Sequence, residues 1–144
     1  MRTFQISDRF TTADIGLELE ADCLEELFAA AADGMFSIIF GDRPSENATG
    51  SEEINLQADS LEQLLVDWLS ELLFLFDAQG QIPTDIRLQI NDDATPVMLY
   101  ATANYRPYDR NREVAEHEVK AVTYHMLKIR KDDNRFWCHV VFDL

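Results

Sequence analysis

The chain has 144 residues, close to the commonest size of a single domain, and 47% of them are hydrophobic, including nine Phe and four Tyr. That composition excludes a disordered chain of low hydrophobicity, so we expect one folded domain over residues 1–144. Twelve basic residues against 27 acidic ones give a net charge of −15, which disfavours direct, stable RNA or DNA binding and favours a basic protein partner or a bound cation.

The N-terminal sequence MRTFQISDRF lacks the apolar core of a signal peptide. No window reaches the roughly 18 apolar residues that a membrane span needs. We therefore expect a cytoplasmic protein with no membrane association. The two cysteines, Cys23 and Cys138, have no paired spacing, so in a reducing compartment we expect two free, mostly buried thiols.

The first strong pattern follows the polar stretch FTTAD. Apolar and polar residues alternate over residues 15–20, which is the period of a strand with one buried face. Residues 24–39 then carry apolar side chains at helical spacing. Asp22 with Glu25 is typical of an N-cap, so we predict that a helix begins there. Gly34 within this helix would allow close approach to a neighbouring element.

The middle of the chain predicts a loop, a strand and a second helix. Residues 41–53 are rich in Gly, Pro, Ser, Asn and acids and form the loop, and residues 54–58 alternate as a short strand. Ser60 and Gln63 stand at capping-box spacing before a helix over residues 61–77. Because its apolar side chains extend beyond one face, we expect this helix to lie at the centre of the core.

The second half of the chain is rich in strands. Residues 85–105 alternate around the turn NDDA and predict a hairpin or meander, and residues 106–118 form a charged loop. Residues 119–131 favour a strand whose middle could be a helical turn, and residues 135–144 form the last strand. Helices that do not alternate strictly with strands favour an α+β fold. We expect two amphipathic helices packed on one largely antiparallel or mixed β-sheet.

The common catalytic signatures are absent from the sequence, including G-x-S-x-G, the Walker glycine loop, H-E-x-x-H and C-x-x-C. Two carboxylates remain of interest because of their positions. Asp14 lies where a polar loop meets the strand at residues 15–20, and Asp143 ends the last strand, one residue before Leu144. If the two strands are neighbours, these side chains and an oxygen of Leu144 converge. Such hard ligands suit Ca²⁺, Mg²⁺ or Mn²⁺ rather than zinc. The alternative is that both are ordinary solvated acids.

Four stretches resemble the archease family in order and at compatible distances, and together they cover essentially the whole chain. They are TADIG at 12–16, WLSELLFLFD at 68–77, EVKAVTYHML at 118–127 and VVFDL at 140–144. The resemblance implies a protein that is not itself an enzyme but activates an RtcB-type RNA ligase, which joins 3′-phosphate and 5′-hydroxyl ends in tRNA splicing and RNA repair. It would promote the metal- and GTP-dependent guanylylation of the ligase histidine and multiple turnover.

The resemblance also implies roles for particular residues. Asp14, Asp143 and Leu144 match the family's metal site, which is described as calcium-binding. Lys120 matches a lysine implicated in activation. The acidic tip formed by the metal-site residues would then enter or abut the ligase active site and place a divalent ion near the nucleotide phosphates. Lys120 would meet phosphate charge as a flexible point charge.

Two departures from the family pattern stand near these residues. Thr11 occupies the position where the family usually has a histidine, and Tyr105 and Arg106 stand where a small residue and an acid are expected. Two other functions are also compatible with the sequence. One is a metal-dependent phosphoesterase, in which two carboxylates and a metal activate water. The other is a chaperone-like module that binds clients through an apolar patch.

Overall fold

The structure is a computed structural model that describes residues 2–7, 14–41 and 47–144. The elements in chain order are β1 (Arg2–Ser7), β2 (Asp14–Ala21), α1 (Leu24–Phe40), β3 (Gly50–Ala58), α2 (Leu61–Gln79), β4 (Gln81–Asn91), β5 (Val97–Pro107), β6 (Ala121–Thr123), β7 (Arg130–Asp132) and β8 (Arg135–Asp143).

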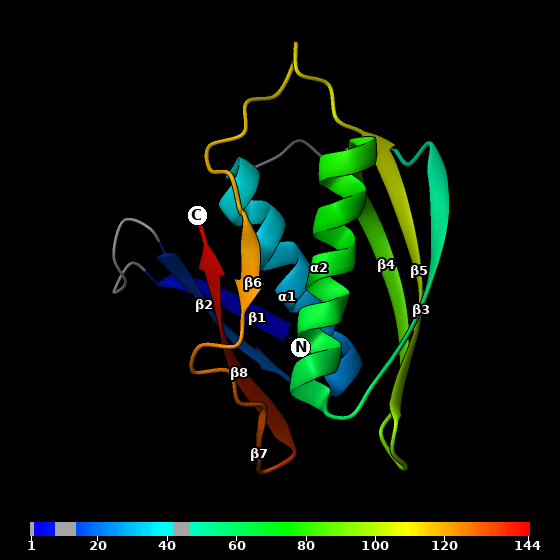
Figure 1. Ribbon diagram of the computed structural model, residues 1–144, viewed down its shortest axis with the longest axis vertical. Helices are drawn as coiled ribbons and strands as arrows, with labels where there is room; N and C mark the ends of the chain where they lie inside the picture. The colour runs from blue at the N-terminus through cyan, green and yellow to red at the C-terminus, as the bar shows by residue number, and fades with distance from the viewer. Residues whose placement is uncertain (1, 8–13, 42–46) are drawn as a thin grey trace.

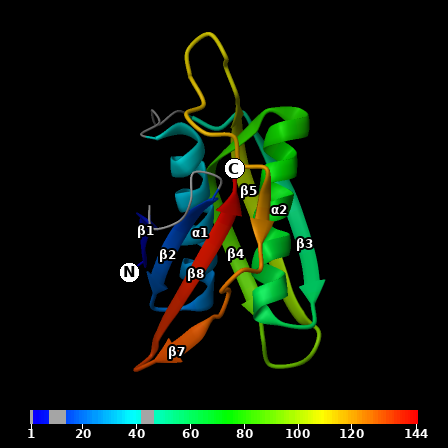
Figure 2. The same cartoon turned by 60° about the vertical axis from the view of Figure 1, so that its left-hand side comes forward.

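The strands form two antiparallel sheets, and the two helices lie between them (Figure 1). The larger sheet has the order β1-β2-β8-β6, with β7 also paired to β8, and the smaller has the order β3-β5-β4. Figure 2 shows β8 between β2 and β6. Each helix contacts strands of both sheets. The predicted α+β class is confirmed, but the expectation of a single sheet was wrong. Helices that are apolar on more than one side need apolar cover on both sides.

The two helices begin in different ways. Ser60 caps α2 as predicted, because its Oγ accepts the N–H of Gln63 at 3.1 Å. The predicted cap of α1 was wrong: Cys23 is the N-cap residue and makes no side-chain capping bond. Asp22 instead accepts a hydrogen bond from Nη1 of Arg135 at 3.1 Å, so its carboxylate ties the end of β2 to the start of β8.

The core lies between the sheets, around the two helices. Trp68 of α2 is fully buried, and its indole Nε1 donates to the carbonyl of Phe28 in α1 at 3.0 Å. The expected close approach at Gly34 is confirmed: a Cβ there would lie 2.5 Å from Cδ2 of Leu17 on β2. The absence of a side chain at Gly34 therefore lets α1 pack directly on the larger sheet.

The β-rich second half matches the sequence in part. The hairpin is confirmed as β4 and β5, and the final strand as β8. Residues 119–131 are not one continuous strand, because a turn separates β6 from β7 and the N–H of Leu127 donates to the carbonyl of Tyr124 there at 3.0 Å. Of the two alternatives for the middle of this segment, a turn is therefore closer than a strand. Met126 between β6 and β7 has a φ of 57°, in the left-handed region, which interrupts a strand. β1 pairs with β2 along its whole length and had no counterpart among the predicted elements.

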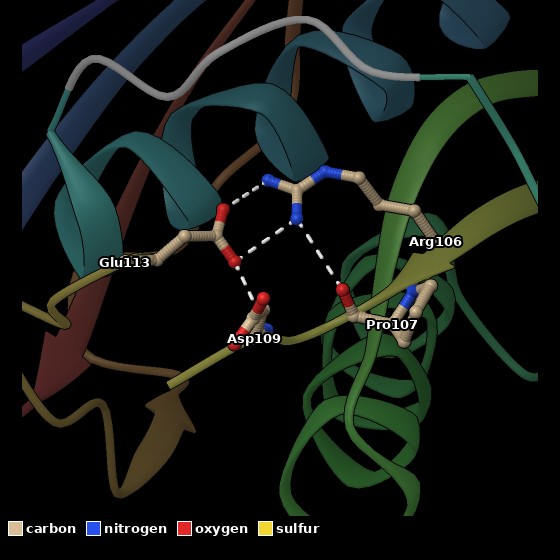
Figure 3. Close-up of polar contacts among 4 residues, drawn as sticks. All are labelled: Arg106, Pro107, Asp109 and Glu113. Carbon is tan, nitrogen blue, oxygen red and sulfur yellow. Dashed lines mark hydrogen bonds and ion pairs between the residues drawn. The ribbon is translucent and has the colours of Figure 1, made fainter. Parts of the chain in front are cut away.

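A buried ion pair holds the start of the loop between β5 and β6 (Figure 3). Arg106 and Glu113 have side chains that are only 3% and 7% exposed. Nη1 of Arg106 donates to Oε2 of Glu113 at 2.9 Å while Nη2 donates to Oε1, so the contact is bidentate. Oε2 also accepts the N–H of Asp109 at 3.3 Å. The arginine that replaces the acid expected at position 106 is thus neutralised by an acid of the loop itself.

The rest of this loop is fastened to the ends of both helices. The N–H of Tyr108 donates to the carbonyl of Gly80, the C-cap residue of α2, at 2.7 Å. The N–H groups of Glu116 and His117 donate to the carbonyl of Ile39 in α1, at 2.6 and 3.3 Å. The loop therefore joins β5, α2 and α1 before the chain enters β6.

Gly34→Ala tests the close approach of α1 to the larger sheet. Alanine favours the helix by about 1 kcal/mol, but overpacking against the fully buried Leu17 costs about 1–3 kcal/mol. We expect a net loss of about 1 kcal/mol in the free energy of unfolding, measured by urea denaturation. Ser37→Ala on the same helix is the matched control and should be neutral or slightly stabilising. A Gly34→Ala protein as stable as the control would contradict this packing.

Glu113→Ala tests the buried ion pair. It leaves the Arg106 guanidinium buried without its carboxylate, so we expect a loss of about 3–5 kcal/mol in the free energy of unfolding. The exchanged pair Arg106→Glu with Glu113→Arg restores both charges and should recover part of that loss in the same urea titration. Asp92→Ala, at an exposed site in the turn between β4 and β5, should change stability by less than about 0.5 kcal/mol.

The same pair should make stability depend on pH. Its hydrogen bonds with Arg106 lower the pKa of Glu113 from the ordinary value of 4.5, against the opposing effect of burial. The stabilisation is therefore complete above 4.5 and is lost as the pH falls through the lower, folded-state pKa. Between neutral pH and about pH 3, the wild-type protein should lose more free energy of unfolding than Glu113→Gln. Equal losses would show that the pair does not carry this dependence.

Candidate functional site at the end of the larger sheet

Asp14 and Asp143 lie opposite one another at one end of the larger sheet. Asp14 is the first residue of β2 and Asp143 the last of β8, and the antiparallel register pairs them directly. Side chains of directly opposed residues project from the same face, with Cβ atoms about 4.5–5.5 Å apart. The condition set by the sequence, that these two strands are neighbours, is therefore confirmed.

The two carboxylates project from the face of the sheet that points away from the helices. The next pair along the ladder, Ile15 with Phe142, belongs to the opposite face, where Phe142 is fully buried in the core. Asp14 and Asp143 are each half-buried. Among the residues that the structure describes, no cation forms an ion pair with either of them. Two carboxylates are thus held opposite each other without an ion pair to a basic side chain of the described residues.

Lys120 and Leu144 flank this pair. The N–H of Lys120 donates to the main-chain carbonyl of Asp143 at 2.7 Å, and Ala121 of β6 pairs with Asp143 on the side of β8 away from β2. Leu144 follows Asp143 and packs partly buried against the core, while Lys120 itself is exposed. The sequence linked Lys120 to this site only through the family resemblance. The pairing of β6 with β8 is what brings it here.

The chemistry of this arrangement suits a hard cation. Within the described parts of the chain, no three His, Cys, Asp or Glu side chains converge, so a metal here would draw two side-chain carboxylates from Asp14 and Asp143. Main-chain or terminal oxygens near Leu144 and water would complete the ligand set. Oxygen-only coordination of this kind fits Ca²⁺ or Mg²⁺, whereas zinc prefers His and Cys ligands. Thr11, the position of the expected histidine, lies outside the described residues.

The cysteines and histidines, all of which lie in the described residues, do not join this site. Both cysteines are free, as expected, and burial raises the pKa of the Cys138 thiol to about 12, so it is not a thiolate at neutral pH. His117 lies in the loop before β6, His125 in the turn after β6, and His139 on β8 opposite Glu18.

Neither helix in the described residues is long and apolar enough to cross a membrane.

Known proteins of one family match this chain over nearly all of its length. A model of the Archease protein family (MTH1598/TM1083) matches residues 4–144. The archease of Pyrococcus furiosus is 35% identical over 134 residues, which cover 92% of this chain and 94% of that protein. The archease of Methanosarcina barkeri is 37% identical over 134 residues, covering 92% and 91% of the two chains.

Solved structures agree with these sequence matches. Protein 1598 of Methanobacterium thermoautotrophicum superposes with a TM-score of 0.83 at 30% identity, over 98% of both chains. An archease from Thermotoga maritima, described as a possible chaperone, gives a TM-score of 0.61 over 93% of both chains; its 24% identity supports the fold alone. With a family model matched over nearly all of its length and relatives above 30% identity, this chain belongs to the archease family.

Proposed function

We propose that this protein activates an RtcB-type RNA ligase in tRNA splicing and RNA repair, by promoting guanylylation of the ligase and its multiple turnover. Membership of the archease family supports the proposal. The observation that carries it is the pairing of Asp14 with Asp143, together with the hydrogen bond from Lys120 N–H to the Asp143 carbonyl. Residues far apart in the chain thereby form one acidic tip with a lysine beside it.

In this proposal the tip holds a divalent cation, Ca²⁺ in the first place and Mg²⁺ or Mn²⁺ as alternatives. When bound, the ion supplies positive charge near the nucleotide phosphates. Asp14 and Asp143 hold and orient it, and they lie on the sheet face that points away from the helices. Lys120 offers its ammonium to phosphate oxygens. The net charge of −15 draws the protein toward a basic partner surface and away from free RNA.

Activation of a partner fits the site better than catalysis by this chain alone. A metal-dependent phosphoesterase needs a general base beside its metal, and the described side chains near Asp14 and Asp143 provide no third His, Cys, Asp or Glu to act as one. Chaperone-like binding is the second candidate, because the large apolar side chains of Phe4, Ile6 and Trp137 are exposed on β1 and β8. Suppression of client aggregation, with no effect on a ligase, would favour that candidate.

Alanine variants of the tip test the proposal. We expect Asp14→Ala and Asp143→Ala to lower the multiple-turnover rate of a purified RtcB-type ligase at least about tenfold, because each removes an oxygen ligand of the ion. Lys120→Ala should also lower the rate, and Lys120→Arg should lower it less because it keeps the charge. The assay is guanylylation and ligation with GTP, at saturating activator.

Folding and charge are controlled in the same assay. Asp92→Ala removes a carboxylate from the exposed turn between β4 and β5 and should activate like the wild-type protein. Circular dichroism and urea titration confirm that each variant is folded before its activity is compared. If the Asp14, Asp143 and Lys120 alanine variants all activate the ligase as well as the wild-type protein does, the proposal is wrong.

Calcium binding by the tip is measurable without a ligase. An ion that binds only the folded state raises the free energy of unfolding by about 2.7 kcal/mol at a hundredfold excess over its Kd. For a chain of this size we expect a rise in Tm of about 10 °C, reversed by chelator. Asp14→Asn with Asp143→Asn should abolish the rise, and Asp92→Asn should not. A rise that survives in the double variant would place the ion elsewhere.

A further inference from the structure

A pocket distinct from the acidic tip lies between the C-terminal end of α2 and the loop that joins β5 to β6. Its volume is about 520 Å³. Its buried lining is apolar and comes from α1, α2 and the loop, namely Ile39, Leu73 and Val119. Exposed carboxylates stand around it, Asp77 on α2 and Glu118 on the loop. The pocket thus combines an apolar interior with acidic groups at its mouth.

The walls of this pocket are fixed in the protein on its own. The buried Arg106–Glu113 pair holds the start of the loop (Figure 3), and the N–H of Tyr108 is bonded to Gly80 at the end of α2. Further along, His117 donates to the carbonyl of Ile39. The loop does not need a partner to take this shape, so a ligand would meet a preformed site.

The charge around the pocket is negative on balance. Asp77 and Glu118 lie near each other, since the charge of Glu118 adds to the effect of burial in raising the pKa of Asp77. Neither helix has a basic residue in its last turn, so no cationic side chain of the helices offsets the partial negative charge of their C-terminal ends. This potential favours a cation.

Glu113, Arg110 and His117 also line the pocket. Glu113 is already neutralised by Arg106, and it contributes little free charge. Arg110 places its guanidinium carbon 5.9 Å from the centre of the Tyr108 ring, and His117 is exposed on the loop. The Arg110 contact shows that the ring of Tyr108, which itself packs 5.4 Å from the ring of Phe76, can accept a guanidinium.

We propose that this pocket receives an arginine side chain of the partner ligase. The methylene stem of arginine packs on the apolar lining, and its planar head reaches Asp77 and Glu118. The assignment of the partner rests on the proposed function. The class of ligand rests only on the shape, apolar lining and charge of the pocket.

The pocket and the acidic tip are continuous along the chain. Glu118 and Val119 line the pocket, and the next residue, Lys120, donates its N–H to the carbonyl of Asp143 in the tip. Figures 1 and 2 show the loop and the carboxy-terminus toward the same end of the molecule. One partner surface can therefore contact both. In this proposal the pocket contributes affinity for the ligase, and the acidic tip stimulates its guanylylation.

The first test uses N-acetyl-arginine amide as the probe and needs no ligase. In NMR titrations of the full chain, we expect saturable shifts at the amides of Leu73, Phe76 and Val119. Asp77→Asn with Glu118→Gln should weaken binding at least about tenfold, and the matched pair Asp92→Asn with Asp93→Asn should not. N-acetyl-lysine amide should bind more weakly. Absence of saturable shifts, equal binding of the lysine probe, or unchanged binding by the double variant would each overturn the assignment of arginine.

The second test uses the ligase and separates affinity from activation. Asp77→Asn with Glu118→Gln should raise the activator concentration for half-maximal guanylylation at least about tenfold and leave the saturated rate unchanged. Asp14→Ala should lower the saturated rate instead. An unchanged half-maximal activator concentration would overturn the assignment of the pocket to the ligase. If the wild-type protein self-associates and the double variant does not, the pocket binds a second copy of this chain, and the assignment to the ligase is likewise overturned. A wild-type protein that fails to activate the ligase would refute the proposed function. The titration with N-acetyl-arginine amide would then still show whether the pocket binds arginine.

Discussion

The antiparallel pairing of β2 with β8 is the contact on which the site depends. It places β8 between β2 and β6, so that Asp14 and Asp143 face each other and Lys120 reaches the same end. The hydrophobic core enforces this register. A slip of one residue would turn Phe142 to the face away from the helices and Asp143 toward them. Two carboxylates that repel each other are thus held together by apolar side chains on the other face of the sheet.

The loop between β5 and β6 restricts the position of Lys120 at the same end of the protein. It crosses from the smaller sheet to the larger one and bonds to α2 at Gly80 and to α1 at Ile39 on the way. The Arg106–Glu113 pair anchors its start in a nearly solvent-free setting. Because the loop ends at Lys120, the positions of both helices and of β5 help to set where that lysine lies.

Local patterns predicted local features well. Ser60 and Gln63 stand three residues apart, and the capping bond follows from that spacing alone. The alternation over residues 85–105 likewise indicated the β4–β5 hairpin, whose partners are close in sequence. The sequence also indicated that Asp14 and Asp143 would meet, but only on the condition that their strands are neighbours. No local pattern decides which distant strands pair.

The failures have the same physical origin. Asp22 has the composition of a helix cap, yet Arg135, more than a hundred residues away, takes its carboxylate. The division of the strands into two sheets depends on how much of each helix surface must be covered, which is a property of the whole core. The partner of Arg106 lies within an irregular loop that has no period from which to read it. Each error concerns a contact made by tertiary packing rather than by sequence spacing.

The parallel course of the two helices has an electrical consequence for the whole molecule. Both C-terminal ends meet the β5–β6 loop, and no basic residue stands in the last turn of either helix (Figure 1). Acidic residues occupy both first turns, Glu25 and Glu26 in α1 and Glu62 in α2, and offset the partial positive charge at the other end. The two peptide dipoles therefore add along one axis. Their negative ends therefore lie together beside the β5–β6 loop, where main-chain N–H groups of the loop, rather than basic side chains, bind the carbonyls of Ile39 and Gly80.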